Sequence, residues 1–127
     1  MKNKQDSTTL FYKNLGELFY AIAYADGVVE ATEIETLKMV VKQAWSHSNN
    51  ANIIVDMFDW LHDTKAHEAQ VCFDNFLSYM TTNKVLFTPK TKALVLQTAN
   101  AIASRFSGRN KSELILLAKL DIELKKI

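Results

Sequence analysis

The stretch Ala25-Asp26-Gly27-Val28-Val29-Glu30-Ala31-Thr32-Glu33 separates two segments whose apolar residues recur at helical spacing. Gly27 follows the first segment, and glycine ends a helix at low steric cost because it adopts positive φ freely. Glu30 and Glu33 stand where the second segment starts, and negative charge is favourable at a helix N-terminus. The stretch therefore predicts an acidic turn that joins two helices in a hairpin.

The same periodicity, with capping and breaking residues, predicts about six helices along the chain. They start at Ser7–Thr9, near Ala31, after Asn50, after a turn around Thr64, at Thr88-Pro89 and at Lys111, and they end at Gly27, in the polar cluster 46–50, near Thr64, near Thr82, at Gly108 and towards Lys125. At one constant offset, Ile22-Ala23 aligns with Ile102-Ala103 and Glu33 with Glu113, which indicates two related helix hairpins. The predicted fold is an all-α, compact bundle of about six helices, in one domain that spans residues 1–127.

Composition agrees with that fold and limits the function. The 127 residues are 48% hydrophobic and include only 3 Gly and 1 Pro, so few residues break helices. The 15 basic and 14 acidic residues give a net charge of +1. No overall field attracts nucleic acid, and nucleic acid is not an expected partner.

The start of the chain is polar, and no apolar segment is long enough to span a bilayer. A single cysteine, Cys72, cannot form an internal disulfide, which agrees with a reducing compartment. We therefore expect a cytoplasmic protein without a membrane span. Cys72 also lies within an apolar stripe, which predicts a core thiol and not a nucleophile.

Two interpretations of the acidic turn are open. In the first, its acidic residues only stabilise a helix end. In the second, the carboxylates of Asp26, Glu30 and Glu33 bind a divalent cation weakly, because hard cations prefer oxygen ligands. A complete EF-hand loop is excluded, because Ile22 and Tyr24 stand where its first two ligands would be.

The segment after Asn50 has one apolar and one acidic face. The residues predicted to be buried are Ile54, Met57, Phe58 and Leu61, and the opposite face carries Asn52, Asp56, Asp59 and Asp63. Such a stripe is typical of a solvated helix face, and it could also attract a cation or a basic partner. Trp60 sits beside the stripe. The histidines, His47, His62 and His67, lack the spacing of a zinc site and are predicted to lie on the surface.

The turn is similar to the signature of the TerB-like family of tellurite-resistance-associated domains, in which Ala-Asp-Gly is followed by a hydrophobic residue and by a Glu that opens the next helix. Here the signature reads Ala25-Asp26-Gly27-Val28-Val29 with Glu33. The resemblance implies a cytoplasmic helical bundle tied to stress response, with a divalent metal at the acidic turn and with other proteins as partners. The second turn, Phe106-Ser107-Gly108-Arg109-Asn110, lacks Asp-Gly and departs from the family pattern.

We therefore expect a non-enzymatic scaffold or sensor that binds a divalent cation at Asp26, Glu30 and Glu33 and engages a protein partner. The alternative is a purely structural module without a metal site, whose sixth helix forms a homodimer or partner interface. That helix is apolar around most of its circumference, which predicts a helix that is either central or shared with a partner. An enzyme is not expected, because no nucleophile and base stand at diagnostic spacing and no glycine-rich phosphate loop is present.

Overall fold

The computed structural model describes residues 4–25, 29, 31–65, 67–105 and 111–127, and for residues 4–7, 33 and 105 it describes the backbone only. These residues form six α-helices and one short 3-10 helix, without a strand among them, so the predicted all-α bundle is confirmed. The elements are α1 (Lys4–Ala23), α2 (Ala31–Ala44), α3 (Ala51–Thr64), α4 (Ala69–Thr82), η1 (Lys84–Leu86), α5 (Pro89–Arg105) and α6 (Lys111–Lys125).

Most predicted helix boundaries are confirmed. The Thr88 hydroxyl accepts a hydrogen bond from the backbone N–H of Thr91 at 3.2 Å, so Thr88 caps α5 as its position before Pro89 predicted. The start of α1 was predicted too late, because the helix already includes Lys4 and the predicted capping residues Ser7–Thr9 lie inside it. The predicted ends at Gly27 and Gly108 lie outside the described residues, and η1 was not predicted.

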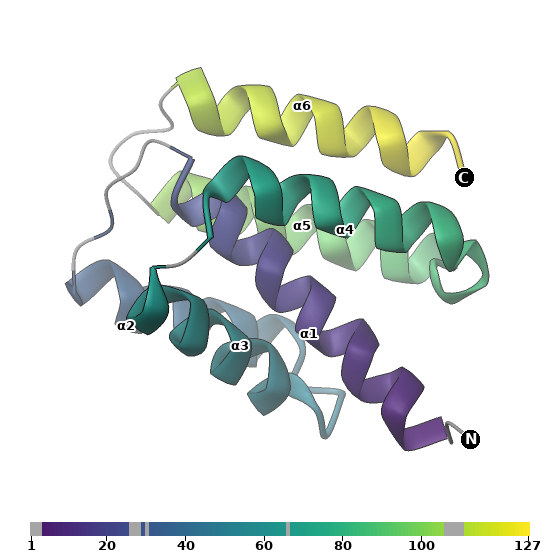
Figure 1. Cartoon of the computed structure of the whole chain (residues 1–127), viewed down its shortest axis with the longest axis horizontal. Coiled ribbons are helices and arrows are strands. Elements are labelled where there is room, and N and C mark those ends of the chain that lie inside the picture. The colour runs from purple at the N-terminus through teal and green to yellow at the C-terminus, as the bar shows by residue number, and fades with distance from the viewer. Residues whose placement is uncertain (1–3, 26–28, 30, 66, 106–110) are drawn as a thin grey trace.

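Helix α1 is the centre of the bundle (Figure 1). In that view α1 runs diagonally between α2 and α3 on one side and α4, α5 and α6 on the other. It packs most extensively against α3 and α4 and also contacts α5 and α6. All six residues from Leu18 to Ala23 are buried, although the sequence predicted only one buried face. Because neighbours surround this half of the helix, even its small residues, such as Ala21, contribute to the core.

Helix α6, in contrast, lies at the edge of the bundle. One face, formed by Leu116, Leu117, Leu120 and Leu124, is buried. The side chains of Leu114, Ile115 and Ile122 remain 46%, 46% and 54% exposed. Of the two predictions for this apolar helix, the central position is therefore wrong, because α1 takes that position. A shared interface stays a prediction.

Helices α1 and α3 approach each other closely at Gly16. Gly16 faces α3, and a Cβ atom built on it would lie 2.7 Å from Cβ of Met57 and 2.9 Å from the backbone oxygen of Ile54. Real Cβ contacts are almost never that short, so only glycine allows this helix spacing. A glycine inside a helix costs about 1 kcal/mol relative to alanine, which the close packing has to offset.

We expect Gly16→Ala to destabilise the protein. Overpacking of a tight contact costs about 1–3 kcal/mol, and the higher helix propensity of alanine returns about 1 kcal/mol. Urea denaturation should therefore show a net loss of up to about 2 kcal/mol in the free energy of unfolding. Thr8→Ala, at an exposed position of the same helix, is the control and should change stability by less than about 0.5 kcal/mol. A stabilised Gly16→Ala variant would contradict the close approach.

Candidate functional site: a groove between two helices

The predicted metal ligands fall largely outside the described structure. Asp26 and Glu30 lie outside the described residues, and Glu33 stands in the first turn of α2 with only its backbone described. The structure therefore leaves the cation site at Asp26, Glu30 and Glu33 a prediction. Among the described side chains elsewhere, no three His, Cys, Asp or Glu residues come close enough together to hold a metal ion.

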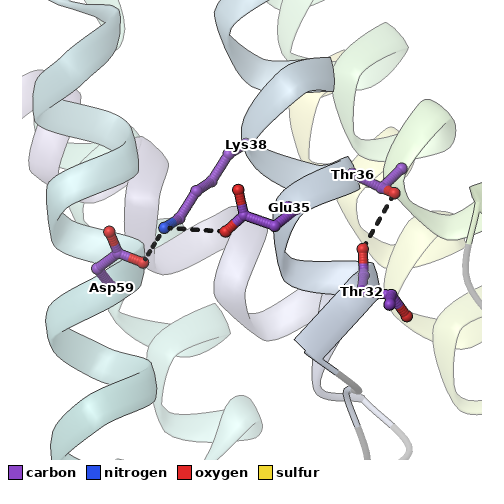
Figure 2. Close-up of polar contacts among 5 residues, drawn as sticks. All are labelled: Thr32, Glu35, Thr36, Lys38 and Asp59. Carbon is purple, nitrogen blue, oxygen red and sulfur yellow. Dashed lines mark hydrogen bonds and ion pairs between the residues drawn. The ribbon is translucent and has the colours of Figure 1, made fainter.

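One carboxylate of the predicted acidic stripe on α3, that of Asp59, forms an ion pair (Figure 2). Lys38 of α2 approaches Asp59 with an Nζ–Oδ1 distance of 2.9 Å, and its Nζ lies 3.6 Å from Oε2 of Glu35. The hydrogen bond to Asp59 is the main cause of a raised pKa for Lys38. Asp59 thus joins α3 to α2 and is not simply solvated. Asp56 and Asp63 are exposed, as predicted, and form no ion pair within the part of the chain that is described.

In the same region of α2, the Thr36 hydroxyl donates to the backbone oxygen of Thr32, one helical turn earlier, at 3.2 Å (Figure 2). Both Thr32 and Glu35 are exposed, and Thr36 is half-buried. The Thr36 hydroxyl and the Glu35 carboxylate thus make contacts within α2, and Lys38 also reaches across to Asp59 on the neighbouring helix.

A groove of about 460 Å³ lies between α1 and α3. Its lining residues are Thr9 and Lys13 from α1 and Ile53, Asp56, Met57 and Trp60 from α3. Thr9 and Lys13 lie in the two turns that precede Gly16, so the groove opens on one side of the close approach between the helices. The volume falls in the range of ordinary ligand pockets, about 300–1,000 Å³.

Trp60 is the most conspicuous side chain of this groove, because half of it (50%) is exposed. Its ring packs against His67 at a centroid distance of 5.7 Å. His67 is held in turn because its backbone oxygen accepts a hydrogen bond from the Tyr20 hydroxyl at 3.4 Å. Part of the indole is therefore in contact with the α3–α4 connection, and another part is exposed to solvent at the groove.

The two walls are fixed at both ends. At one end the Ser48 hydroxyl donates to the Tyr12 hydroxyl at 2.9 Å, which ties α1 to the turn before α3. At the other end the rings of Tyr20 and Tyr24 stack at 4.5 Å, and the Tyr24 hydroxyl is hydrogen-bonded to Nδ1 of His62 on α3. Burial raises the pKa of Tyr24 to about 12, so its hydroxyl stays protonated in this contact. The groove is thus built into the packing of the bundle.

The sequence contained a signal for the α3 wall that the prediction missed. Ile53, Met57 and Trp60 follow i, i+4, i+7 spacing and form a second apolar stripe between the core face and the acidic face. Met57 was predicted to be buried, and the structure shows it half-buried at the groove. The α1 wall carried no such signal, because nothing local indicates that Thr9 and Lys13 face α3.

Of the predicted surface histidines, only His47 is exposed. His62 and His67 are half-buried, and this part of the prediction is wrong because both belong to the aromatic packing around α3. Cys72 is fully buried in α4, which confirms a core thiol. Burial, helped by the nearby Glu17 carboxylate, raises the pKa of the Cys72 thiol to about 12.

Comparison of the chain with protein-family models, with curated proteins and with solved structures finds no match. None of the helices in the described part of the chain is both long and apolar enough to cross a membrane. The groove is therefore interpreted from its own residues and geometry.

We expect Cys72 to resist alkylation in the native protein. Its raised pKa, about 12, keeps the thiol neutral at pH 8, and the thiolate is the reactive form. Iodoacetamide at pH 8, followed by mass spectrometry, should modify the native protein far more slowly than the same protein in denaturant. Rapid, complete labelling without denaturant would show an accessible thiol and contradict the buried position.

Proposed function

We propose that this chain is a non-enzymatic protein-interaction domain whose α1–α3 groove receives an apolar side chain from a partner. The observation that carries the proposal is the half-exposed Trp60 beside a groove with an apolar floor of Ile53 and Met57. Tryptophan is enriched among the residues that dominate the binding energy of interfaces. A pre-formed site also avoids the cost of ordering a loop on binding.

The outer face of α6 is a second candidate surface, in line with the alternative of a dimerisation module. Its Leu114, Ile115 and Ile122 are about as exposed as Trp60. However, these side chains project from a single helix at the edge of the bundle, and the groove offers two opposed walls. Anchoring residues of interfaces are typically found in pockets, and this favours the groove.

The groove can be tested by selection of peptides from a random display library on the immobilised protein. Wild type is compared with Trp60→Ala and with Ile122→Ala, a matched control that removes a side chain of similar exposure from α6. We expect peptides that bind wild type and Ile122→Ala equally but bind Trp60→Ala at least about 30-fold more weakly, equivalent to about 2 kcal/mol. Circular dichroism verifies that both variants are folded.

The outcomes of this selection separate the two surfaces. Peptides that lose affinity for Ile122→Ala and not for Trp60→Ala would move the interaction to α6. If selected peptides depend on neither residue, or if none are selected, the groove does not have the proposed function.

We further propose that the acidic turn binds a divalent cation, which would make the domain a sensor as well as a scaffold. The support is the chemistry of the donors Asp26, Glu30 and Glu33 and the resemblance of the turn to the TerB-like signature. That resemblance also supports an association with stress response. The α1–α3 groove does not depend on this part of the proposal.

We expect an amide NMR titration of metal-free protein with calcium, magnesium, zinc or manganese to give saturable changes confined to residues 25–33. An Asp26→Ala variant should lose the response, because one of three carboxylate ligands is removed. Asp74→Ala, at an exposed position of α4, controls for the change in net charge. If no metal changes the signals of residues 25–33, the acidic residues act only as a helix cap.

A further inference from the structure

We propose that the segment bound in the α1–α3 groove carries an arginine next to an apolar side chain. The apolar side chain fills the space over Ile53 and Met57. The arginine lies over the exposed part of the Trp60 indole, within reach of the carboxylates of Asp56 and Asp63. This inference rests on the proposed function of the groove and names the chemistry of its partner.

The first observation is the position of two carboxylates around Trp60. Asp56 precedes Trp60 by four residues and Asp63 follows it by three, so both lie on the same side of α3 as the indole, one turn to either side. Both are exposed, and within the described structure neither has a basic partner. The third carboxylate of the stripe, Asp59, is engaged by Lys38 on the side of α2. The α3 side of the groove therefore carries negative charge.

The second observation is the indole between these carboxylates. A cation over the face of a tryptophan is attracted by the ring quadrupole, and arginine is the residue found there most often. Its planar guanidinium can stack on the ring and still direct N–H groups sideways to a carboxylate. A lysine ammonium is a compact, strongly hydrated charge and makes this double contact less well. The combination of Trp60, Asp56 and Asp63 therefore favours arginine.

The α1 wall of the groove determines how the bound peptide segment is oriented. Lys13 lines the groove on that side and is exposed, so a partner cation there would meet a like charge. The bound arginine should thus face α3, and a neutral or acidic residue should face α1. Charge complementarity across the two walls gives the site orientation, in addition to the non-directional attraction of its apolar floor.

The same charges disfavour other classes of partner. Phosphate groups of a nucleic acid or of an anionic lipid would meet the carboxylates of Asp56 and Asp63, and among the described residues that line the groove they would gain only Lys13 as a counter-charge. A basic peptide segment is the occupant that both the apolar floor and the α3 wall fit. Vesicles of phosphatidylserine provide a direct check, and groove-dependent binding to them would overturn the proposed occupant.

The selected peptides test this chemistry. Among peptides that depend on Trp60, we expect arginine to be enriched near a large apolar residue. In a synthetic version of the most enriched peptide, arginine is replaced by glutamine. Fluorescence anisotropy should show binding to wild type weakened about tenfold, and the difference should shrink as salt is raised.

Three variants assign the effect to the named residues. Asp56→Asn/Asp63→Asn should bind the arginine peptide about threefold more weakly, less than the full effect of replacing arginine because the contact with the indole remains, and should bind the glutamine peptide unchanged. Asp74→Asn/Asp121→Asn changes the net charge equally on α4 and α6 and should leave both peptides unaffected. Trp60→Leu keeps an apolar side chain without the indole, so its effect should be larger for the arginine peptide than for the glutamine peptide.

The outcomes distinguish this inference from the proposed function. Trp60-dependent peptides that are neutral or acidic, or an arginine peptide that is insensitive to Asp56→Asn/Asp63→Asn, would overturn the arginine site and leave the groove as an interaction site. An absence of any Trp60-dependent peptide would overturn both.

Discussion

The burial of the second half of α1 on all sides is the constraint on which the rest of this structure depends. Leu18, Phe19 and Ile22 are completely buried, and each such side chain contributes about 1.5–3 kcal/mol when it leaves water. The small residues Ala21 and Ala23 between them are buried as well, so helices can approach α1 closely from several directions. Helices α3, α4, α5 and α6 all contact α1, and the bundle is organised as a set of neighbours around one helix.

The candidate site follows from the same arrangement. Helices that cross at an angle are close at one point and separate on either side of it. Gly16 is that point for α1 and α3, because the absence of a side chain lets Met57 and the backbone of Ile54 come within van der Waals contact. The turns of α1 before Gly16 carry Thr9 and Lys13, which border the space that opens there. The groove is thus the consequence of one tight contact, not of a missing element.

The sequence could predict the helices well because their signals are local. The cap at Thr88, the proline after it, and the apolar stripe that includes Cys72 depend only on residues within a few positions of one another. The central helix could not be identified in this way. The circumference of α6 looks more apolar than that of α1, yet α6 leaves Ile122 half exposed while α1 is enclosed, because burial depends on which helices become neighbours.

The candidate site was also predictable only where its signals are local in the sequence. The α3 wall can be found from helical spacing in the sequence, because Ile53, Met57 and Trp60 share one side of that helix. The predicted acidic stripe was correct as a pattern, but the pattern could not show that Lys38 would cross from α2 to Asp59. Nor could it show that α1 supplies the opposite wall, since that is a contact between segments about forty residues apart in sequence.

The Lys38–Asp59 ion pair distinguishes Asp59 from the other two carboxylates of the stripe, Asp56 and Asp63. An ion pair this exposed contributes at most about 1 kcal/mol to stability, so its main effect is on the distribution of charge. By engaging the carboxylate nearest α2, Lys38 leaves the negative charge of α3 concentrated at Asp56 and Asp63, on either side of Trp60. Lys38 offsets the charge of Asp59, whereas Asp56 and Asp63 have no ion-pair partner among the described residues. The packing of α2 against α3 therefore determines which carboxylates of the acidic stripe remain available to a cationic partner.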